Sequence, residues 1–65
     1  MAIQLKAARV NANLTQEDVA KLLCVSKNTI VNYEKYTRKP SVERAKELAK
    51  LYGMSVDDII WSLAE

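Results

Sequence analysis

The stretch from Thr15 to Lys39 reads TQEDVAKLLCVSKNTIVNYEKYTRK, and it decides the fold. Apolar residues recur at helical spacing in two short segments, which we expect to be helices over about residues 16–23 and 27–35. A short turn around Cys24 is all that separates them. The second segment keeps polar residues on its outer face. The stretch therefore predicts a helix-turn-helix at about residues 16–35.

Helix start signals agree with this spacing along the chain. A Ser or Thr stands before each later apolar segment, at Thr15, Ser26, Ser41 and Ser55. Such hydroxyls cap helices by accepting a hydrogen bond from a first-turn N–H, and Asp18 suggests a capping box with Thr15. We expect an all-α fold, a single compact domain over residues 1–65. Its five helices are expected at about residues 3–11, 16–23, 27–35, 42–52 and 56–63.

The apolar positions of these helices predict the core. Two choices stay open, because either Tyr33 or Glu34 turns inward on the third helix and either Tyr52 or Leu51 on the fourth. Asn13 and Gly53 are expected to end helices, since both tolerate a left-handed backbone. The other expected inward residues are Leu5, Ala8, Ala12, Val19, Ala20, Leu23, Val25, Ile30, Ala45, Leu48, Ala49, Val56, Ile59, Ile60 and Leu63.

The composition argues against several classes of protein. With 65 residues, no His and Cys24 as the single cysteine, the chain has no means of forming an internal disulfide, a Cys/His zinc site or a His-containing triad. We therefore expect no catalysis, no cofactor, no metal and no small-molecule ligand. No segment resembles a signal peptide or a membrane span, and the free thiol suits the cytoplasm. Cys24 is expected to be inert, with a redox switch as the alternative.

Charge is distributed unevenly along the chain. The net charge is only +2. Residues 27–39 contain four basic residues and one acidic residue, Glu34, for a net charge of +3. Residues 53–65 contain three acidic residues and no basic residue. A small domain with a basic face and an acidic end will orient in the field of a polyanion. The alternative is an ordinary solvated surface.

Three polar residues, Lys27, Asn28 and Asn32, face outward on the second helix of the predicted motif. The first two lie in its first turn, the part of such a helix that enters the major groove of DNA. An Asn side chain can make a paired contact with adenine, and Lys can donate to guanine. We therefore expect these three residues to contact bases, rather than to be ordinary exposed polar residues.

Contacts with the DNA backbone are expected around them. Gln16 begins the preceding helix, and helix N-termini attract anions because their N–H groups are unpaired. Three basic residues lie within residues 35–39, at the end of the recognition helix and directly after it. Two hydroxyls that cap and pack at the start of that helix are also within reach of a phosphate. The expected phosphate contacts are Gln16, Ser26, Thr29, Lys35, Arg38 and Lys39.

A group of short segments also carries a family resemblance. The sequence from about residue 5 to 60 resembles the Cro and repressor-type (XRE-like) helix-turn-helix regulators of phages and bacteria. The resemblance implies a five-helix lambda-repressor-like domain that binds double-stranded DNA. It also implies a transcriptional repressor acting as a homodimer on a palindromic operator. The residues that carry it include Leu5, Ala8-Arg9, Leu14-Thr15-Gln16, Val19-Ala20, Leu23, Val25-Ser26, Thr29-Ile30, Tyr33-Glu34, Lys39-Pro40-Ser41 and Gly53-Met54-Ser55-Val56.

The same resemblance implies a salt bridge between Arg9 and Glu34, which would join the first and third helices. It also implies the three base contacts named above and, among the phosphate contacts, those of Gln16, Lys35, Arg38 and Lys39. The chain departs from the family at Cys24 and Tyr36, where Gly is usual at the first position and frequent at the second. A left-handed backbone at Cys24 would cost on the order of 1 kcal/mol.

One recognition helix reads only a few base pairs, so we expect two copies to pair on DNA across a two-fold axis, with half-sites about 10 base pairs apart. The interface is expected at the loop after Tyr36, near Val42, and at the start or end of the last helix. Trp61 either packs back onto the first helix or joins this contact. The alternative function is an antitoxin or anti-repressor type of protein-interaction module on the same fold.

Overall fold

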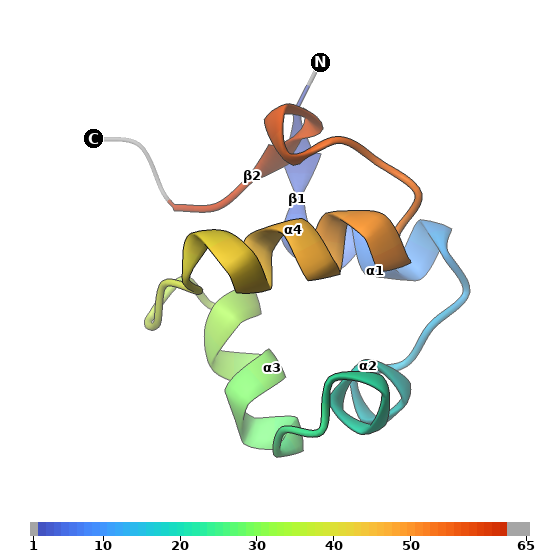
Figure 1. The fold of residues 1–65 in the computed structure, drawn as a ribbon, viewed down its shortest axis with the longest axis vertical. Helices are drawn as coiled ribbons and strands as arrows, with labels where there is room; N and C mark the ends of the chain where they lie inside the picture. Colours follow the sequence, from blue (N-terminus) through green and yellow to red (C-terminus); the bar gives the residue numbers. More distant parts are fainter. Residues whose placement is uncertain (1, 63–65) are drawn as a thin grey trace.

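The chain is mostly helical in the computed structural model, which describes residues 2–62 (Figure 1). Within that range it forms four α-helices, one turn of 3-10 helix and two strands of two residues each. In chain order the elements are β1 (Ile3–Gln4), α1 (Leu5–Asn11), α2 (Gln16–Leu23), α3 (Lys27–Glu34), α4 (Val42–Leu51), η1 (Val56–Asp58) and β2 (Ile59–Ile60).

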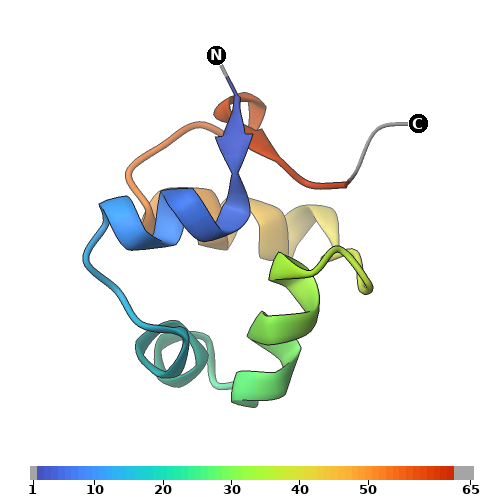
Figure 2. The same ribbon diagram turned by 180° about the vertical axis from the view of Figure 1, so that it is seen from behind.

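The elements lie at three levels. Helices α2 and α3 form one end of the molecule, α1 and α4 cross its middle, and the strands lie at the opposite end (Figures 1 and 2). The strands are parallel, with Ile3 paired with Ile59 and Gln4 with Ile60. No helix in the described part of the chain is long and apolar enough to cross a membrane.

Helix α2 has the predicted bounds and the predicted capping box. The Thr15 hydroxyl accepts from the Asp18 N–H at 3.0 Å, and an Asp18 carboxylate oxygen accepts from the Thr15 N–H at 2.9 Å. The backbone N–H of Thr15, and then its hydroxyl, hold the pKa of Asp18 below its ordinary value. The predicted caps at Ser26 and Ser41 are also confirmed, because each hydroxyl accepts from a backbone N–H three residues on.

The turn of the helix-turn-helix is a left-handed residue at Cys24, with φ 57° and ψ 43°. The Val25 N–H donates to the Ala20 carbonyl and the Cys24 N–H to the Lys21 carbonyl. These two bonds are the Schellman pattern that ends many helices. Without glycine at this position the backbone costs on the order of 1 kcal/mol. The tight turn is therefore made at a residue that is not suited to it.

The predicted fifth helix and the predicted start of the first helix are both wrong. Helix α1 begins at Leu5 instead of Ile3, because residues 3–4 are extended and no capping side chain precedes them. After Gly53 the chain makes only η1, and the Ser55 hydroxyl donates to the Asp58 carboxylate instead of capping an N–H. β-Branched residues then favour a strand. The predicted inward position Leu63 lies outside the described residues.

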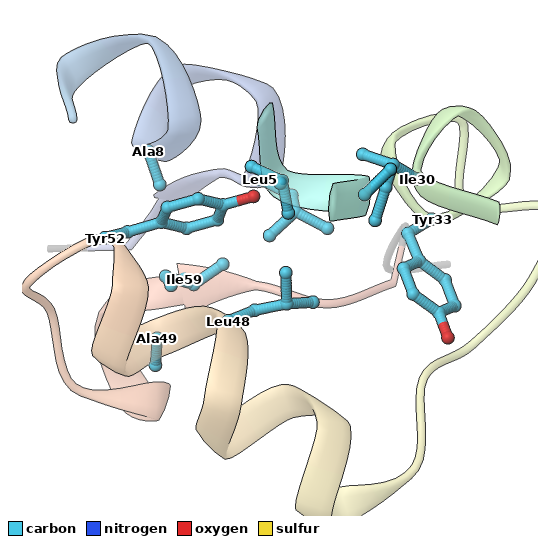
Figure 3. Close-up of a cluster of buried hydrophobic side chains, with 10 residues drawn as sticks. Leu5, Ala8, Ile30, Tyr33, Leu48, Ala49, Tyr52 and Ile59 are labelled. Atoms are coloured by element: carbon cyan, nitrogen blue, oxygen red, sulfur yellow. The ribbon is translucent and has the colours of Figure 1, made fainter. Parts of the chain in front are cut away.

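The core lies between the two middle helices and the helix-turn-helix. Figure 3 shows side chains from α1, α3, α4 and β2 converging there. On the third helix both candidates turn inward, because Tyr33 is buried and the Glu34 side chain is only 5% exposed. On the fourth, Tyr52 is buried whereas Leu51 is only partly so. Ala12, Leu23 and Val25 pack against this core while remaining partly exposed. The cluster consists of Leu5, Ala8, Val19, Ala20, Ile30, Tyr33, Leu48, Ala49, Tyr52 and Ile59.

Tyr52 places a polar atom inside this core. Its side chain is 7% exposed, and its hydroxyl has no hydrogen-bond partner among the described residues. Burial, followed by the negative charge of Glu34, raises the pKa of Tyr52 to about 12, against the opposing effect of Arg9. The ring therefore contributes apolar contacts, while its hydroxyl is desolvated without compensation.

Removal of the Tyr52 hydroxyl should change how the free energy of unfolding depends on pH at alkaline pH, because the pKa of this group is raised. The pKa of Tyr52 is raised to about 12 in the folded state, so between about pH 10 and 12 the unfolded chain releases the phenolic proton and the folded chain keeps it. The contribution of Tyr52 to the free energy of unfolding is therefore fully present below about pH 10 and is lost as the pH rises to about 12. Tyr52→Phe should keep or slightly raise the free energy of unfolding at pH 7 and lose less of it above pH 10. Urea unfolding of both proteins from pH 7 to 11 measures the difference. Parallel pH curves would contradict the assignment.

Candidate nucleic-acid interface

The first turn of α3 is exposed at the end of the molecule. Lys27 and Asn28, predicted to contact bases, are both exposed there. The Ser26 hydroxyl accepts from the Thr29 N–H at 3.3 Å and lies 3.0 Å from the Thr29 hydroxyl. These contacts stop the end of the helix from fraying and hold both hydroxyls together beside Lys27. A partner that approaches this end meets a cation, an amide and two hydroxyls on one rigid turn.

Asn32 differs from the other two predicted base contacts because it is half-buried. Its backbone carbonyl accepts from the Thr37 N–H at 3.1 Å, from the Thr37 hydroxyl at 3.2 Å and from the Arg38 N–H at 3.4 Å. Its side-chain carbonyl also lies 3.4 Å from the Thr37 hydroxyl. The side-chain N–H groups of Asn32 donate to no described residue, and the backbone of Asn32 ties the following loop to α3.

The basic residues predicted to contact phosphates all lie on the surface. Lys35, Arg38 and Lys39 are exposed, and none of them forms an ion pair with another described residue. Lys35 caps the end of α3, and the other two follow in the loop between α3 and α4. Their charges are therefore available to an anion that lies along this side of the recognition helix.

Gln16 belongs to a buried polar network that joins three helices. Arg9, on α1, donates from Nε to Glu34 Oε2 at 2.6 Å and from Nη2 to Glu34 Oε1 at 3.3 Å. Gln16, at the start of α2, donates from Nε2 to Glu34 Oε1 at 3.0 Å. The third nitrogen of Arg9, Nη1, donates to the Leu14 carbonyl at 2.8 Å. The side chains of Arg9 and Glu34 are only 10% and 5% exposed.

This network fixes the direction in which the Gln16 amide points. The Nε2 atom carries two hydrogens, of which one is directed at Glu34, so the other remains for a ligand at the N-terminus of α2. The Glu34 carboxylate is in turn neutralised by a bidentate guanidinium, the geometry in which such pairs are strongest. The angle between the recognition helix and the first helix thus depends on the same carboxylate that orients Gln16.

The reasoning from sequence missed two residues that support this surface. Arg44, on α4, donates from Nη1 to the Leu23 carbonyl at 3.3 Å and so satisfies the C-terminal end of α2. Thr37 joins the loop to Asn32, as described above. Neither had a usable signal, because Arg44 is 21 residues from its partner and Thr37 is an ordinary loop residue by type.

The described residues offer little to a metal ion. Residues 2–62 contain no group of three or more His, Cys, Asp or Glu side chains placed to hold one. Cys24 is an exposed free thiol in the turn between α2 and α3. The chemistry of this surface is that of cations, amides and hydroxyls.

A family model described as helix-turn-helix matches residues 5–59, which include every element from α1 to the first residue of β2. The chain belongs to this family. The match confirms the resemblance to Cro and repressor-type regulators that the sequence indicated.

Curated relatives of this helix-turn-helix chain carry the names of regulators. It is 46% identical over 59 residues to an uncharacterized helix-turn-helix-type transcriptional regulator of Methanocaldococcus jannaschii, covering 91% of this chain and 89% of that protein. It is 39% identical over 57 residues to the cryptic phage CTXphi transcriptional repressor RstR of Vibrio cholerae, covering 88% of this chain and 51% of RstR.

A third relative is the helix-turn-helix-type transcriptional regulator ImmR of Bacillus subtilis. The identity is 35% over 57 residues, which covers 88% of this chain and 45% of ImmR. The chain thus spans about half the length of RstR and ImmR but nearly the whole of the archaeal protein. No solved structure matches the chain significantly.

The buried ion pair should matter more for stability than the exposed one. Arg9→Met leaves the Glu34 carboxylate buried without its cation, and this should lower the free energy of unfolding by about 3–5 kcal/mol. Glu47→Gln is the matched control: it breaks the exposed Arg44–Glu47 pair of 3.6 Å and should cost at most about 1 kcal/mol. Urea unfolding at pH 7 measures both variants.

The double variant Arg9→Met/Glu34→Leu tests the cause of the loss. It replaces both charges by apolar groups, so it should recover much of the stability that Arg9→Met loses. An Arg9→Met variant that is no less stable than Glu47→Gln would show that the network contributes little.

Proposed function

We propose that this chain is a sequence-specific DNA-binding transcriptional regulator that reads the major groove with α3. The observation that carries the proposal is the exposed first turn of α3, which presents Lys27 and Asn28 on a helix-turn-helix scaffold. Three exposed basic side chains, which form no ion pair with a described residue, follow the other end of the same helix. An α-helix fits the major groove, and Lys and Asn can hydrogen-bond to guanine and adenine there.

The proposed contacts divide into two groups with different effects. Lys27, Asn28 and Asn32 contact base edges, with Asn32 acting through its free N–H groups. A set of donors around them holds the DNA backbone and carries no sequence information. Gln16 is part of this set, because Glu34 leaves one of its N–H groups for a phosphate at the N-terminus of α2. The proposed phosphate contacts are Gln16, Ser26, Thr29, Lys35, Arg38 and Lys39.

The relatives favour repression as the mode of action. RstR is named as a phage transcriptional repressor, and it shares 39% identity with this chain over 57 residues. A repressor needs only to occupy its operator, which is a binding role and needs no catalytic group. The competing role, an antitoxin or anti-repressor that grips a partner protein, would call for an apolar recognition face, whereas α3 presents polar residues.

A homodimer is the proposed form on DNA, and the fold provides a suitable surface. A hollow of about 330 Å³ lies beside the start of α4, with the Trp61 side chain on one wall. Trp61 Nε1 donates to the Val56 carbonyl at 2.9 Å, which fixes the ring at that place. Val42 is 73% exposed next to it. The hollow is lined by Lys39, Pro40, Val42, Ala45, Lys46, Val56 and Trp61, and no residue of α1 takes part.

A two-fold axis near this hollow would let an exposed Val42 of one copy enter the apolar hollow of the other. The same contact would repeat symmetrically, as two-fold interfaces require. The hollow adjoins the basic loop, so pairing here would leave both recognition helices free to face one side of the duplex. Its small size suits copies that associate mainly on DNA.

Binding to selected DNA tests the proposed function directly. Ligands selected from a random duplex pool should share one palindromic sequence with half-sites about 10 base pairs apart. A dimer that neutralises about six phosphates should give a slope near −5 for log affinity against log salt concentration. A slope near zero, with no enriched sequence, would overturn the proposal and favour the protein-interaction role.

Two variants separate base contacts from phosphate contacts in the same assay. Asn28→Ala should lose roughly 1–3 kcal/mol on the selected sequence and little on random DNA. Arg38→Ala should weaken binding to both DNAs alike and flatten the slope by about one unit for each phosphate that is no longer neutralised. Equal losses for Asn28→Ala on both DNAs would show that it does not read sequence.

The dimer is tested with Val42→Glu. The side chain is exposed and an acidic residue suits the first turn of a helix, so the fold should be kept. The wild type should bind a two-half-site duplex as a cooperative dimer, and the variant should lose that cooperativity. Analytical ultracentrifugation with and without DNA measures the stoichiometry. A wild-type protein that stays one-to-one on this DNA would refute the dimer.

A further inference from the structure

Tyr36 bridges two backbone segments that are distant from it in sequence. Its hydroxyl accepts from the Leu5 N–H at 3.1 Å and donates to the Ile60 carbonyl at 3.2 Å. Leu5 directly follows β1, and Ile60 is the last residue of β2. The hydroxyl therefore stands at the end of the two-stranded ladder, just beyond the pair formed by Gln4 and Ile60.

This arrangement relays one backbone hydrogen bond through a side chain. The Leu5 N–H donates a hydrogen bond to the phenolic oxygen, and the phenolic O–H donates one to the Ile60 carbonyl. Both backbone groups are partly buried, and Leu5 is among the most buried residues of the core. Without the hydroxyl, each group would lose its partner in a place that water reaches poorly.

The backbone of Tyr36 lies at the start of the loop that carries Arg38 and Lys39, two of the proposed phosphate contacts. Tyr36 comes after the C-cap residue Lys35 and has φ 62°, a left-handed value that is strained for a tyrosine. Strain of this kind persists only where surrounding contacts hold it. The contacts here are the Tyr36 N–H to the Tyr33 carbonyl at 3.1 Å and the two bonds of the hydroxyl.

The loop that follows is therefore held at two points. Asn32 accepts bonds from Thr37 and Arg38, which fix the loop to α3. The Tyr36 side chain fixes the same loop to the first residue of α1 and to the last residue of β2. Arg38 and Lys39 lie at and just after these attachment points, and both side chains are exposed and free of ion pairs with described residues. In Figure 2 this loop connects α3 to α4.

We propose that Tyr36 is a positioning residue for DNA binding: its hydroxyl fastens the loop of residues 36–40 to the two paired strands and so holds Arg38 and Lys39 against the DNA backbone. The effect on DNA rests on the proposed function. The hold on the loop itself does not, and it exists in the free protein.

Tyr36→Phe tests the proposal because it removes the hydroxyl and keeps the ring. Tyr52→Phe is the matched control, since it removes a buried hydroxyl that bonds to no described residue. In the free protein, ¹⁵N relaxation and amide exchange should show greater motion at Arg38 and Lys39 and faster exchange at Leu5 in Tyr36→Phe alone. Circular dichroism at 25 °C establishes that both variants are folded.

The DNA assay gives the second measurement. Tyr36→Phe should lose on the order of threefold to tenfold in affinity, equally on selected and random DNA, with a flatter salt slope. A loss of stability alone would leave the slope and the loop amides of the folded protein unchanged, and that result would overturn the proposal. A wild-type protein that binds no DNA would instead reject the proposed function, while the relaxation data would still decide whether Tyr36 holds the loop.

Discussion

The buried carboxylate of Glu34 is the constraint on which the rest of this small fold depends. It lies in the last turn of the recognition helix, where the helix dipole disfavours a negative charge, and it is nearly inaccessible to water. Arg9 compensates this charge through two hydrogen bonds, and Gln16 adds a third. One buried charge thus joins α1, α2 and α3, and the angle of α3 depends on it.

The proposed DNA-binding surface follows from that arrangement. A recognition helix is useful only when its first turn has a fixed direction relative to the groups that hold the DNA backbone. Glu34 orients Gln16 at the start of α2, and Asn32 and Tyr36 bond to the basic loop or carry it, so the proposed phosphate contacts lie on both sides of α3 in sequence. In the proposed DNA-binding surface, polar networks thus do much of the positioning that a larger core would otherwise provide.

A parallel pair of short strands joins the two ends of the described chain, which adds contacts to a core that is small. Parallel pairing of β1 with β2 brings residues near both ends of the described chain to one edge of the core, where Ile59 is buried. The Tyr36 hydroxyl extends this ladder, and Trp61 then lies over the start of α4. Of these residues, Trp61 also lines the hollow proposed as the dimer surface.

The sequence by itself determined the helix-turn-helix, its caps and the family. These features depend on residues close together in the chain, so periodicity and capping chemistry report them directly. The residues proposed to contact DNA could also be chosen from the sequence, although their contacts are still predictions. Only the tertiary structure decided that Ile59–Ile60 pairs with Ile3–Gln4 instead of continuing a fifth helix. Only it placed the hydroxyl of Tyr36 between Leu5 and Ile60, because both results depend on partners 24 to 56 residues apart, for which local pattern carries no signal.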